Sequence, residues 1–521
     1  AIIVPGDWNS QKEKLYYYEG TIWYKRSFDY EKTRDDNRVF VHFGAINYKA
    51  DVYLNGQKLG VHKGGFTPFN FEITDIVRPK DNFLIVKVDN TRKKDEVPTV
   101  NTDWWNFGGL TRDVSLIEVS STFVSDYFIQ LEKGSKRDIK GYIQLDGEDK
   151  ANRKVIVDIP GLRLKKSLTT DVEGSAELEL NSREIKFWSP DNPMLYDINI
   201  QLDTEVLSDR IGFRTLATRN SDILLNGESI FLRGICIHEE NPIRGGRAYS
   251  MEDSRLLLGW AKELGCNYVR LAHYPHNENM LRLADEMGIM VWEENPVYWT
   301  ISWENKQTYS TAQQQLSEVI SRDKNRASVI IWSMANETPV SDARMEFLKN
   351  LRNFALSKDD TRLISAALEM QGSGEGGLTR KITDPFAEFV DILSFNAYIG
   401  WYDGLPDKCD KIQWAIDQNK PVIVSEFGAG ALQGLHGAQN EIWTEEYQEN
   451  IYAESIEMFQ RLPQLRGTSP WILSDFHSPR RVLPGIQDGW NRKGLIGETG
   501  DKKKAFYVMQ KFYQDVKATW E

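Results

Sequence analysis

The nine residues "VIIWSMANE", 329–337, form an almost unbroken apolar run that stops at Asn336 and Glu337. Such a run is typical of a strand buried on both faces, as the strands of a parallel sheet are. Seven comparable runs follow residue 218: "SIFLRGICIH", "NYVRLAH", "IMVWEE", "LISAALEM", "DILSFNAY", "PVIVSEFG" and "GTSPWILSDF". Amphipathic segments of helical length lie between most of them. These eight β-α repeats predict a (β/α)8 TIM barrel over residues 218–521.

One connecting segment carries clear signals for the start and end of a helix. Ser250 precedes it, Asp253 follows three residues later as in a capping box, and Gly265 closes it. We therefore expect a helix between Ser250 and Gly265.

Residues 1–217 have a different pattern, in which short segments alternate apolar and polar side chains. Examples are "RVFVHFGAI" before residue 120 and "KVIVDIP" after it, with turn signals such as Asn55-Gly56 between such segments. This pattern predicts a β-sandwich over residues 1–120 and a second, immunoglobulin-like sandwich over residues 121–217. The expected fold is therefore multidomain, with two β-sandwiches followed by an α/β barrel.

Charge and composition exclude several classes of protein. The chain has 521 residues and a formal net charge of −12, so nucleic acid is not an expected partner. No apolar run approaches the ~18 residues of a membrane span, so no membrane partner is expected. Three widely spaced cysteines give neither a disulfide framework nor a metal pattern. The sequence begins with Ala and not with Met, so either a signal peptide has been removed or the first residues are missing, and the compartment stays open.

Polar residues end six of the eight predicted barrel strands. In a TIM barrel these carboxyl ends surround the active site. The residues are His238-Glu239, His273, Asn336-Glu337, Asn396-Ala397-Tyr398, Ser425-Glu426 and Asp475.

Two of these residues, Glu337 and Glu426, are carboxylates that only a closed barrel would bring together. Two facing carboxylates suit glycoside hydrolysis, in which one protonates the leaving oxygen and the other attacks the anomeric carbon. Either glutamate alone could instead be a structural ion-pair partner. Their matching positions at two strand ends favour the catalytic interpretation.

Two longer motifs resemble the signatures of glycoside hydrolase family 2. They are "DKNRASVIIWSMANE", residues 323–337, and "NYVRLAHYPHNENMLRLADEMGIMVW", residues 267–292. Leu271 departs from the pattern, which usually has a small residue there. The resemblance covers the whole chain and implies a sugar-binding jelly-roll domain, an immunoglobulin-like domain and a catalytic barrel, in that order.

The resemblance also implies roles for single residues. Glu337 looks like the general acid/base, and Asn336 looks like the residue that binds the sugar 2-hydroxyl. Glu426 in "VSEFGAG" looks like the nucleophile of a retaining mechanism. Tyr398 in "FNAYIGWY" looks like the tyrosine that hydrogen-bonds this nucleophile.

The stretch "WNRKG" indicates which sugar is bound. β-Glucuronidases of this family recognise the sugar carboxylate with an Asn-x-Lys motif after the eighth strand, and Asn491 and Lys493 match it. An amide and an ammonium group together satisfy a buried carboxylate. The alternative is a solvated turn with a lysine of no specific role.

Further residues are expected in the pocket by the same resemblance. Asp103 in "NTDWWNFGG" would reach in from the first domain, and Tyr402 would be a second pocket tyrosine. His238 and His273 look like sugar contacts, and Trp471 looks like an apolar platform. Each has a structural alternative: a turn aspartate, a rim tyrosine, core histidines and a core tryptophan.

The leading hypothesis is a retaining exo-β-glucuronidase that acts on glucuronide small molecules or on glycans ending in glucuronic acid. A β-galacturonidase, a neutral β-hexosidase such as a β-galactosidase, or a carbohydrate-binding protein without catalysis are the alternatives. No cofactor and no metal site are expected. The family commonly forms dimers or tetramers, so a homo-oligomer is expected.

Overall fold

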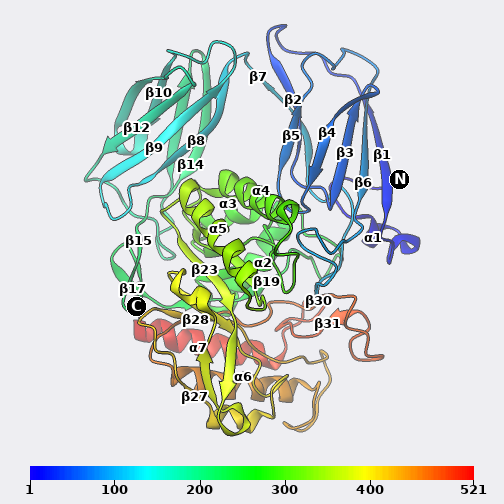
Figure 1. The fold of residues 1–521 in the computed structure, drawn as a ribbon, viewed down its shortest axis with the longest axis vertical. Helices are drawn as coiled ribbons and strands as arrows, with labels where there is room; N and C mark the ends of the chain where they lie inside the picture. Colours follow the sequence, from blue (N-terminus) through cyan, green and yellow to red (C-terminus); the bar gives the residue numbers. More distant parts are fainter. Residues whose placement is uncertain (521) are drawn as a thin grey trace.

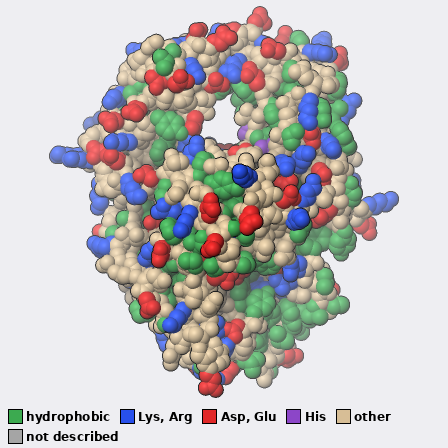
Figure 2. Space-filling model, viewed as in Figure 1, with side chains coloured by type: hydrophobic (Ala, Val, Ile, Leu, Met, Phe, Trp, Pro, Cys, Tyr) green, Lys and Arg blue, Asp and Glu red, His purple; other side chains and the backbone are tan. Residues whose placement is uncertain are grey.

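A computed structural model describes residues 1–520. Two β-sandwiches lie beside each other at one end of the molecule, and the barrel fills the other end (Figure 1). On the face shown in Figure 2, lysine and arginine side chains are interspersed with acidic ones and do not gather into a basic patch. Within the described residues no helix is long and apolar enough to cross a membrane.

The first sandwich packs two antiparallel sheets around Trp8, Val41 and Phe43. One sheet has the order β1-β6-β3-β4 and the other β5-β2-β7. The predicted turn at Asn55-Gly56 joins β3 to β4, with positive φ at both residues. The strands are β1 (Thr21–Phe28), β2 (Arg38–Phe43), β3 (Lys49–Leu54), β4 (Gln57–Lys63), β5 (Phe69–Glu72), β6 (Asn82–Asp89) and β7 (Val114–Val119).

The second sandwich is built in the same way from sheets β11-β10-β13-β14 and β12-β9-β8. Its strands are β8 (Phe123–Leu131), β9 (Asp138–Asp146), β10 (Lys154–Ile159), β11 (Leu164–Thr169), β12 (Ser175–Asn181), β13 (Tyr196–Leu202) and β14 (Glu205–Ile211). A small meander of β15 (Leu216–Arg219), β16 (Asp222–Leu225) and β17 (Glu228–Ile230) leads from it into the barrel.

The barrel sheet is parallel and has the order β18-β29-β28-β26-β23-β22-β21-β20-β19. Its strands are β18 (Leu232–Arg233), β19 (Cys236–Ile237), β20 (Tyr268–Leu271), β21 (Met290–Glu294), β22 (Val329–Asn336), β23 (Leu363–Leu368), β26 (Leu393–Asn396), β28 (Val422–Glu426) and β29 (Leu465–Thr468).

The first predicted strand, "SIFLRGICIH", closes this sheet into a barrel. It is split at Gly234, so that β18 pairs with β29 on one side and β19 pairs with β20 on the other. The backbone of Gly234 donates to Thr468, and that of Arg270 donates to Ile235, on opposite sides of the same segment. The nine strands of the sheet are therefore the eight predicted ones, and the predicted fold class is confirmed.

Helices cover the outside of the barrel and complete its core. They are α2 (Met251–Leu264), α3 (Glu278–Met287), α4 (Lys306–Asp323), α5 (Asp342–Lys358), α6 (Glu445–Gln460) and α7 (Lys504–Trp520), while the short α1 (Trp8–Gln11) belongs to the first sandwich. The capping box at Ser250 and the left-handed Gly265 at the end of α2 are present as predicted.

Two features of the barrel differ from the prediction. The eighth strand ends at Thr468, because Pro470 cannot donate to a sheet, so Trp471 and Asp475 lie in the following loop. Short 3-10 turns replace the helices after the fifth and sixth strands. After the fifth strand the chain forms a hairpin of β24 (Met370–Ser373) and β25 (Thr379–Ile382). The two-residue strand β27 (Gln413–Trp414) pairs with β25.

Candidate active site

The two glutamates lie where two barrel strands end. Glu426 is the last residue of β28, and Glu337 follows β22 directly. Glu337 has a φ of 47°, a left-handed conformation that a non-glycine residue adopts at some energetic cost. Its backbone N–H donates to the carbonyl of Ala367 in the neighbouring strand at 3.0 Å, which fixes this conformation and directs the carboxyl group into the barrel mouth.

Glu426 is held by donors on both of its carboxylate oxygens. The hydroxyl of Tyr398 donates to Oε2 at 2.7 Å, the bond that the family resemblance implied. The guanidinium of Arg270 donates from Nη1 to Oε1, also at 2.7 Å. Charge-assisted hydrogen bonds of this kind stabilise the anionic carboxylate and fix its orientation, as a nucleophile requires.

Arg270 connects the nucleophile position to the rest of the site. It is fully buried and donates from Nη2 to Glu294 at 2.9 Å and to the Oδ1 of Asn336 at 2.8 Å. Burial alone would raise the pKa of Glu294, but Arg270 and His273 hold it at about 2. This permanently charged carboxylate keeps the guanidinium in place between Glu426 and Asn336.

Glu337 is in a different electrostatic environment. Burial and the nearby Glu426 raise its pKa to about 7, although the indole N–H of Trp299 donates to its Oε2 at 3.0 Å. A carboxyl group with this pKa still carries its proton near neutral pH. The environments therefore suit opposite tasks, with Glu337 as the proton donor and Glu426 as the anion.

The orientation of the Asn336 amide is fixed by its neighbours. Its Oδ1 accepts from Arg270 and, at 3.3 Å, from Asn396. The Nδ2 group therefore points the other way, and within residues 1–520 its one hydrogen-bonding contact is a 3.5 Å approach to Glu337. This leaves an N–H free to donate to a ligand hydroxyl beside the two glutamates.

The predicted aromatic residues and histidines line one wall of the same mouth. The ring of Trp471 stacks on that of His273, with centroids 4.8 Å apart, and contacts His238 edge-on at 5.2 Å. Burial lowers the pKa of His238 well below its usual value, so this ring is neutral. Its Nδ1 bonds the hydroxyl of Tyr274 at 3.0 Å, while its buried Nε2 has no hydrogen-bond partner among the described residues.

The eighth loop brings Lys493 into the same space. This loop is a hairpin of β30 (Phe476–His477) and β31 (Trp490–Asn491), and Lys493 follows it, 4% exposed. Its ammonium donates to the hydroxyl of Tyr402 at 2.7 Å and lies 5.7 Å from the ring centroid of Tyr398. The Tyr398 hydroxyl in turn contacts Glu426, so this cation is one residue away from the nucleophile position.

Asp103 extends from the first sandwich to the eighth loop of the barrel. Its carboxylate accepts from Ser478 at 2.6 Å and from Asn491 at 3.2 Å, and it pairs with Arg481. Asn491 also accepts from the backbone N–H of Lys493 at 3.2 Å. Asp103 therefore fixes the conformation of the loop that carries the Asn-x-Lys motif.

Two of the polar strand ends face away from this mouth. Asp475 forms a buried ion pair with Lys503 at 2.8 Å. Glu239 pairs with Arg112 of the first sandwich at 3.0 Å and with Arg247 at 3.2 Å. These carboxylates are structural, and Glu239 ties two domains together.

Sequence reasoning did not single out Arg270, Glu294 or Trp299, although all three contact the predicted residues. The sequence did contain a signal for Arg270 and Glu294. Arg270 interrupts the apolar strand "NYVRLAH", and Glu294 ends "IMVWEE". Charged residues in or at the end of a strand buried on both faces need a specific partner.

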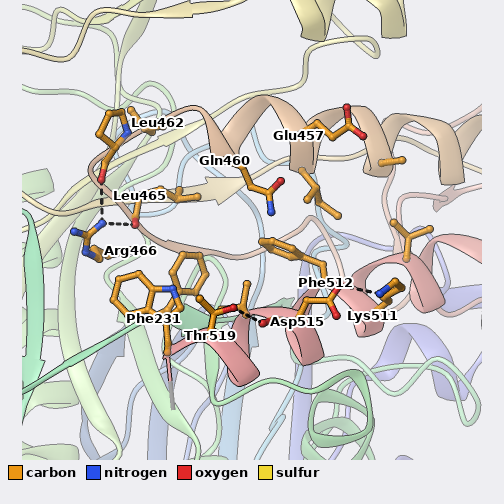
Figure 3. A pocket seen from close by; sticks show the side chains of 16 residues that line it. Phe231, Glu457, Gln460, Leu462, Leu465, Arg466, Lys511, Phe512, Asp515 and Thr519 are labelled. Carbon is orange, nitrogen blue, oxygen red and sulfur yellow. Dashed lines mark hydrogen bonds and ion pairs between the residues drawn. The ribbon is translucent and has the colours of Figure 1, made fainter.

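A cavity of about 580 Å³ lies between α6 and α7, outside the barrel mouth (Figure 3). Phe231 and Leu465 line it, and both lie at the amino ends of barrel strands, opposite to the glutamates. Of its charged groups, Lys511 pairs with Asp515 at 2.9 Å and Arg466 pairs with Asp222 at 2.8 Å. Neither of the two glutamates lines it. Within residues 1–520 no group of His, Cys, Asp or Glu side chains is arranged to hold a metal ion.

The chain is similar to known glycosidases along most of its length. The β-glucuronidase of Paenibacillus borealis is 28% identical over 97% of this chain and 90% of its own length. A longer relative from Formosa agariphila is 26% identical, and this chain spans 66% of it.

Two solved structures are also similar. One is a GH2 β-galacturonidase from Eisenbergiella tayi bound to galacturonate, with a TM-score of 0.88 and 27% identity over 99% of this chain and 93% of that one. The other is a Bifidobacterium dentium β-glucuronidase in complex with coumarin-3-O-glucuronide, with a TM-score of 0.88 and 25% identity over 98% and 92% of the two chains.

Three family descriptions together cover almost the whole chain. The sugar binding domain of glycosyl hydrolases family 2 matches residues 1–120, the central domain of the family matches residues 122–214, and its TIM barrel domain matches residues 216–518. The chain therefore belongs to glycosyl hydrolases family 2.

Proposed function

We propose that this chain is a retaining exo-β-glucuronidase. Family membership supports a glycosidase, and the arrangement of Glu337 and Glu426 supports double displacement. Glu426 attacks the anomeric carbon while the protonated Glu337 gives its proton to the leaving oxygen. The covalent intermediate neutralises the charge of Glu426, which lowers the pKa of Glu337 and allows it to act as a base toward water.

The observation that supports a uronic acid as the bound sugar is the environment of Lys493. Its ammonium is buried and donates to the hydroxyl of Tyr402, and Lys493 lowers the pKa of that phenol although burial opposes the shift. No carboxylate in residues 1–520 forms an ion pair with it. A buried ammonium without a counter-ion is unfavourable, and the carboxylate of a bound uronic acid would supply one. Asn491, Tyr402 and Lys493 would then form the carboxylate site.

The remaining predicted residues fit around this sugar. Asn336 would donate to the 2-hydroxyl, and Asp103 would accept from a hydroxyl at the far side. Trp471 would support the apolar face of the ring, with His238 and His273 beside it.

A β-galacturonidase is the second candidate, because a similar solved structure binds galacturonate. Both sugars carry the same carboxylate and differ in configuration at C4, so Lys493 does not discriminate between them. A neutral β-hexoside has no group to pair with Lys493 and is disfavoured.

The test is a side-by-side measurement of kcat/KM on aryl β-glucuronide, β-galacturonide and β-galactoside. We expect the β-glucuronide to be hydrolysed fastest and the β-galactoside to be slower by at least about 100-fold, the order of one buried charge pair. Faster hydrolysis of the β-galacturonide would identify the chain as a β-galacturonidase instead. Equal rates on the β-galactoside would contradict uronate recognition altogether.

A further inference from the structure

A cavity of about 420 Å³ opens beside Glu337, which lines it. It is large enough for a small molecule, since such sites measure ~300–1,000 Å³. Its walls come from the first sandwich, from the loop after β21 and from the segments after β22 and β23. The lining residues include Asn101, Trp299, Glu337, Leu368, Glu369 and Met370.

Glu369 is the charged group of this cavity besides Glu337 itself. It follows β23, the strand next to the one that carries Glu337, so the two residues are neighbours at the rim. Its side chain is partly buried, and no side chain in residues 1–520 donates a hydrogen bond to its carboxylate. Burial raises the pKa of this carboxyl group, with Asp384 adding to the effect.

The nearest cation is already engaged elsewhere. Arg344 forms a bidentate pair with Asp384 at 2.7 and 2.6 Å, and both side chains are fully buried. The backbone N–H of Glu369 donates to the same aspartate at 3.2 Å, which fixes the position of Glu369 on the rim. The Glu369 carboxylate is thus partly desolvated and has no side-chain donor among residues 1–520. Such a group favours a ligand that supplies one.

The cavity is lined by Glu337, the residue that protonates the leaving oxygen in the proposed mechanism. Atoms beyond that oxygen would therefore enter the space that Glu337 shares with Glu369. Trp299 holds the Glu337 carboxyl group through its indole N–H and lines the same wall. We propose that this cavity is a binding subsite for a hydroxyl-bearing leaving group, namely a second sugar residue, and that Glu369 accepts a hydrogen bond from one of its hydroxyls.

The other walls suit this ligand. Leu368, Met370 and Trp299 offer apolar surface to the C–H groups of a pyranose, while Asn101 and Asn396 offer amides to its hydroxyls. A flat aryl group carries no hydroxyl toward Glu369 and leaves its partly desolvated carboxylate without a donor. This inference rests on the proposed uronidase function and specifies the substrate as an oligosaccharide that ends in a uronic acid.

The test uses kcat/KM, which reports the step in which the leaving group departs. Two substrates are compared: an aryl β-glucuronide and a disaccharide of β-linked glucuronic acid and a neutral hexose. The variants are Glu369→Gln and Glu369→Ala. The matched control is Glu375→Gln, which removes a charge from the exposed tip of the same hairpin. Melting temperatures show that each variant is folded.

We expect Glu369→Ala to lower kcat/KM on the disaccharide at least about tenfold and on the aryl β-glucuronide less than about twofold, with Glu369→Gln between this variant and the wild type. The control should change neither value. Equal losses on both substrates, no loss, or a wild type that does not cleave the disaccharide would overturn the subsite. A wild type inactive on the aryl β-glucuronide would overturn the proposed function as well, so the two failures are distinguishable.

Discussion

Two buried lysines ten positions apart, Lys493 and Lys503, differ in what surrounds their charge. Lys503 pairs with Asp475 at 2.8 Å and also donates to the carbonyls of Ala431 and Arg492 at 2.7 and 3.1 Å. Lys493 has one phenol as its partner and aromatic rings around it. Burial lowers the pKa of both. The charge of Lys503 is satisfied within the protein, whereas that of Lys493 is not.

The same contrast separates the glutamates at the strand ends. Glu239 has two arginines and accepts from the backbone N–H of Asn277, so its bonding capacity is used within the fold. Glu337 accepts from neutral donors such as the indole N–H of Trp299, and its pKa is raised. Burial alone therefore does not identify a functional residue. A buried charge without enough hydrogen-bond or ion-pair partners in the protein is the better indicator of a functional residue. Such a charge destabilises the free protein, and a bound ligand that pairs with it removes this cost.

The largest expected effect is that of Glu426→Ala. Removing the nucleophile should lower kcat at least about 10⁴-fold, as losing a nucleophile does in other covalent mechanisms. The variant should remain folded. Added azide should restore part of the activity by attacking from the vacated side, and the product should be the α-glycosyl azide. A β-configured product, or wild-type activity in the variant, would contradict the assignment of Glu426.

Lys493→Met tests the unsatisfied lysine. We expect kcat/KM on an aryl β-glucuronide to fall about 10³-fold, because the substrate carboxylate would then be buried without a partner. The melting temperature should stay the same or rise, since the substitution removes an uncompensated buried charge. A lowered melting temperature with unchanged activity would show that Lys493 is structural.

Lys503→Met is the opposite case and serves as the matched control. It leaves Asp475 buried beside Arg492 alone, and we expect a loss of about 3–5 kcal/mol in stability. Differential scanning calorimetry should show a clear fall in the melting temperature of the barrel. The folded fraction should keep its preference for uronides, because Lys503 does not line the pocket. A changed substrate preference without a fall in melting temperature would contradict the contrast between the two lysines.

Much of the fold and part of the candidate site could be predicted from the sequence, for a physical reason. Barrel strands are buried on both faces, so their apolar runs are visible, and the polar residues that end them mark one rim. This was enough to predict the two glutamates' positions and the fold. It failed at "GTSPWILSDF", where Pro470 ends the strand early, so that Asp475 lies beyond the strand and pairs with Lys503.

Contacts between loops could not be predicted in the same way. Asp103 was expected in the pocket, but its pairing with Arg481 depends on how the eighth hairpin folds. The hairpin after the fifth strand, which places Glu369, has no helical or strand-length signal. Loop positions depend on tertiary contacts that no periodicity records.

The pH dependence tests the raised pKa of Glu337. A general acid must be protonated in the free enzyme, so kcat/KM should fall as pH rises through about 7, by tenfold for each further unit. In Glu337→Gln this alkaline limb should vanish, and activity should persist only on substrates whose leaving group needs no proton. An alkaline limb that is unchanged in the variant would assign it to another group.

Tyr402→Phe should have the smallest effect and gives the finest test of the contrast between the lysines. The ammonium of Lys493 donates to the Tyr402 hydroxyl, whose own proton is then free to donate to a bound carboxylate. Removing that hydroxyl deletes one hydrogen bond from a neutral donor to the carboxylate, so kcat/KM on uronides should fall only about tenfold, the low end for a hydrogen bond to a charged group. The loss should be small in a Lys493→Met background, because both residues act on the same carboxylate and their effects are not additive. Equal losses in both backgrounds would mean that Tyr402, which is 58% exposed, contacts the substrate independently of Lys493.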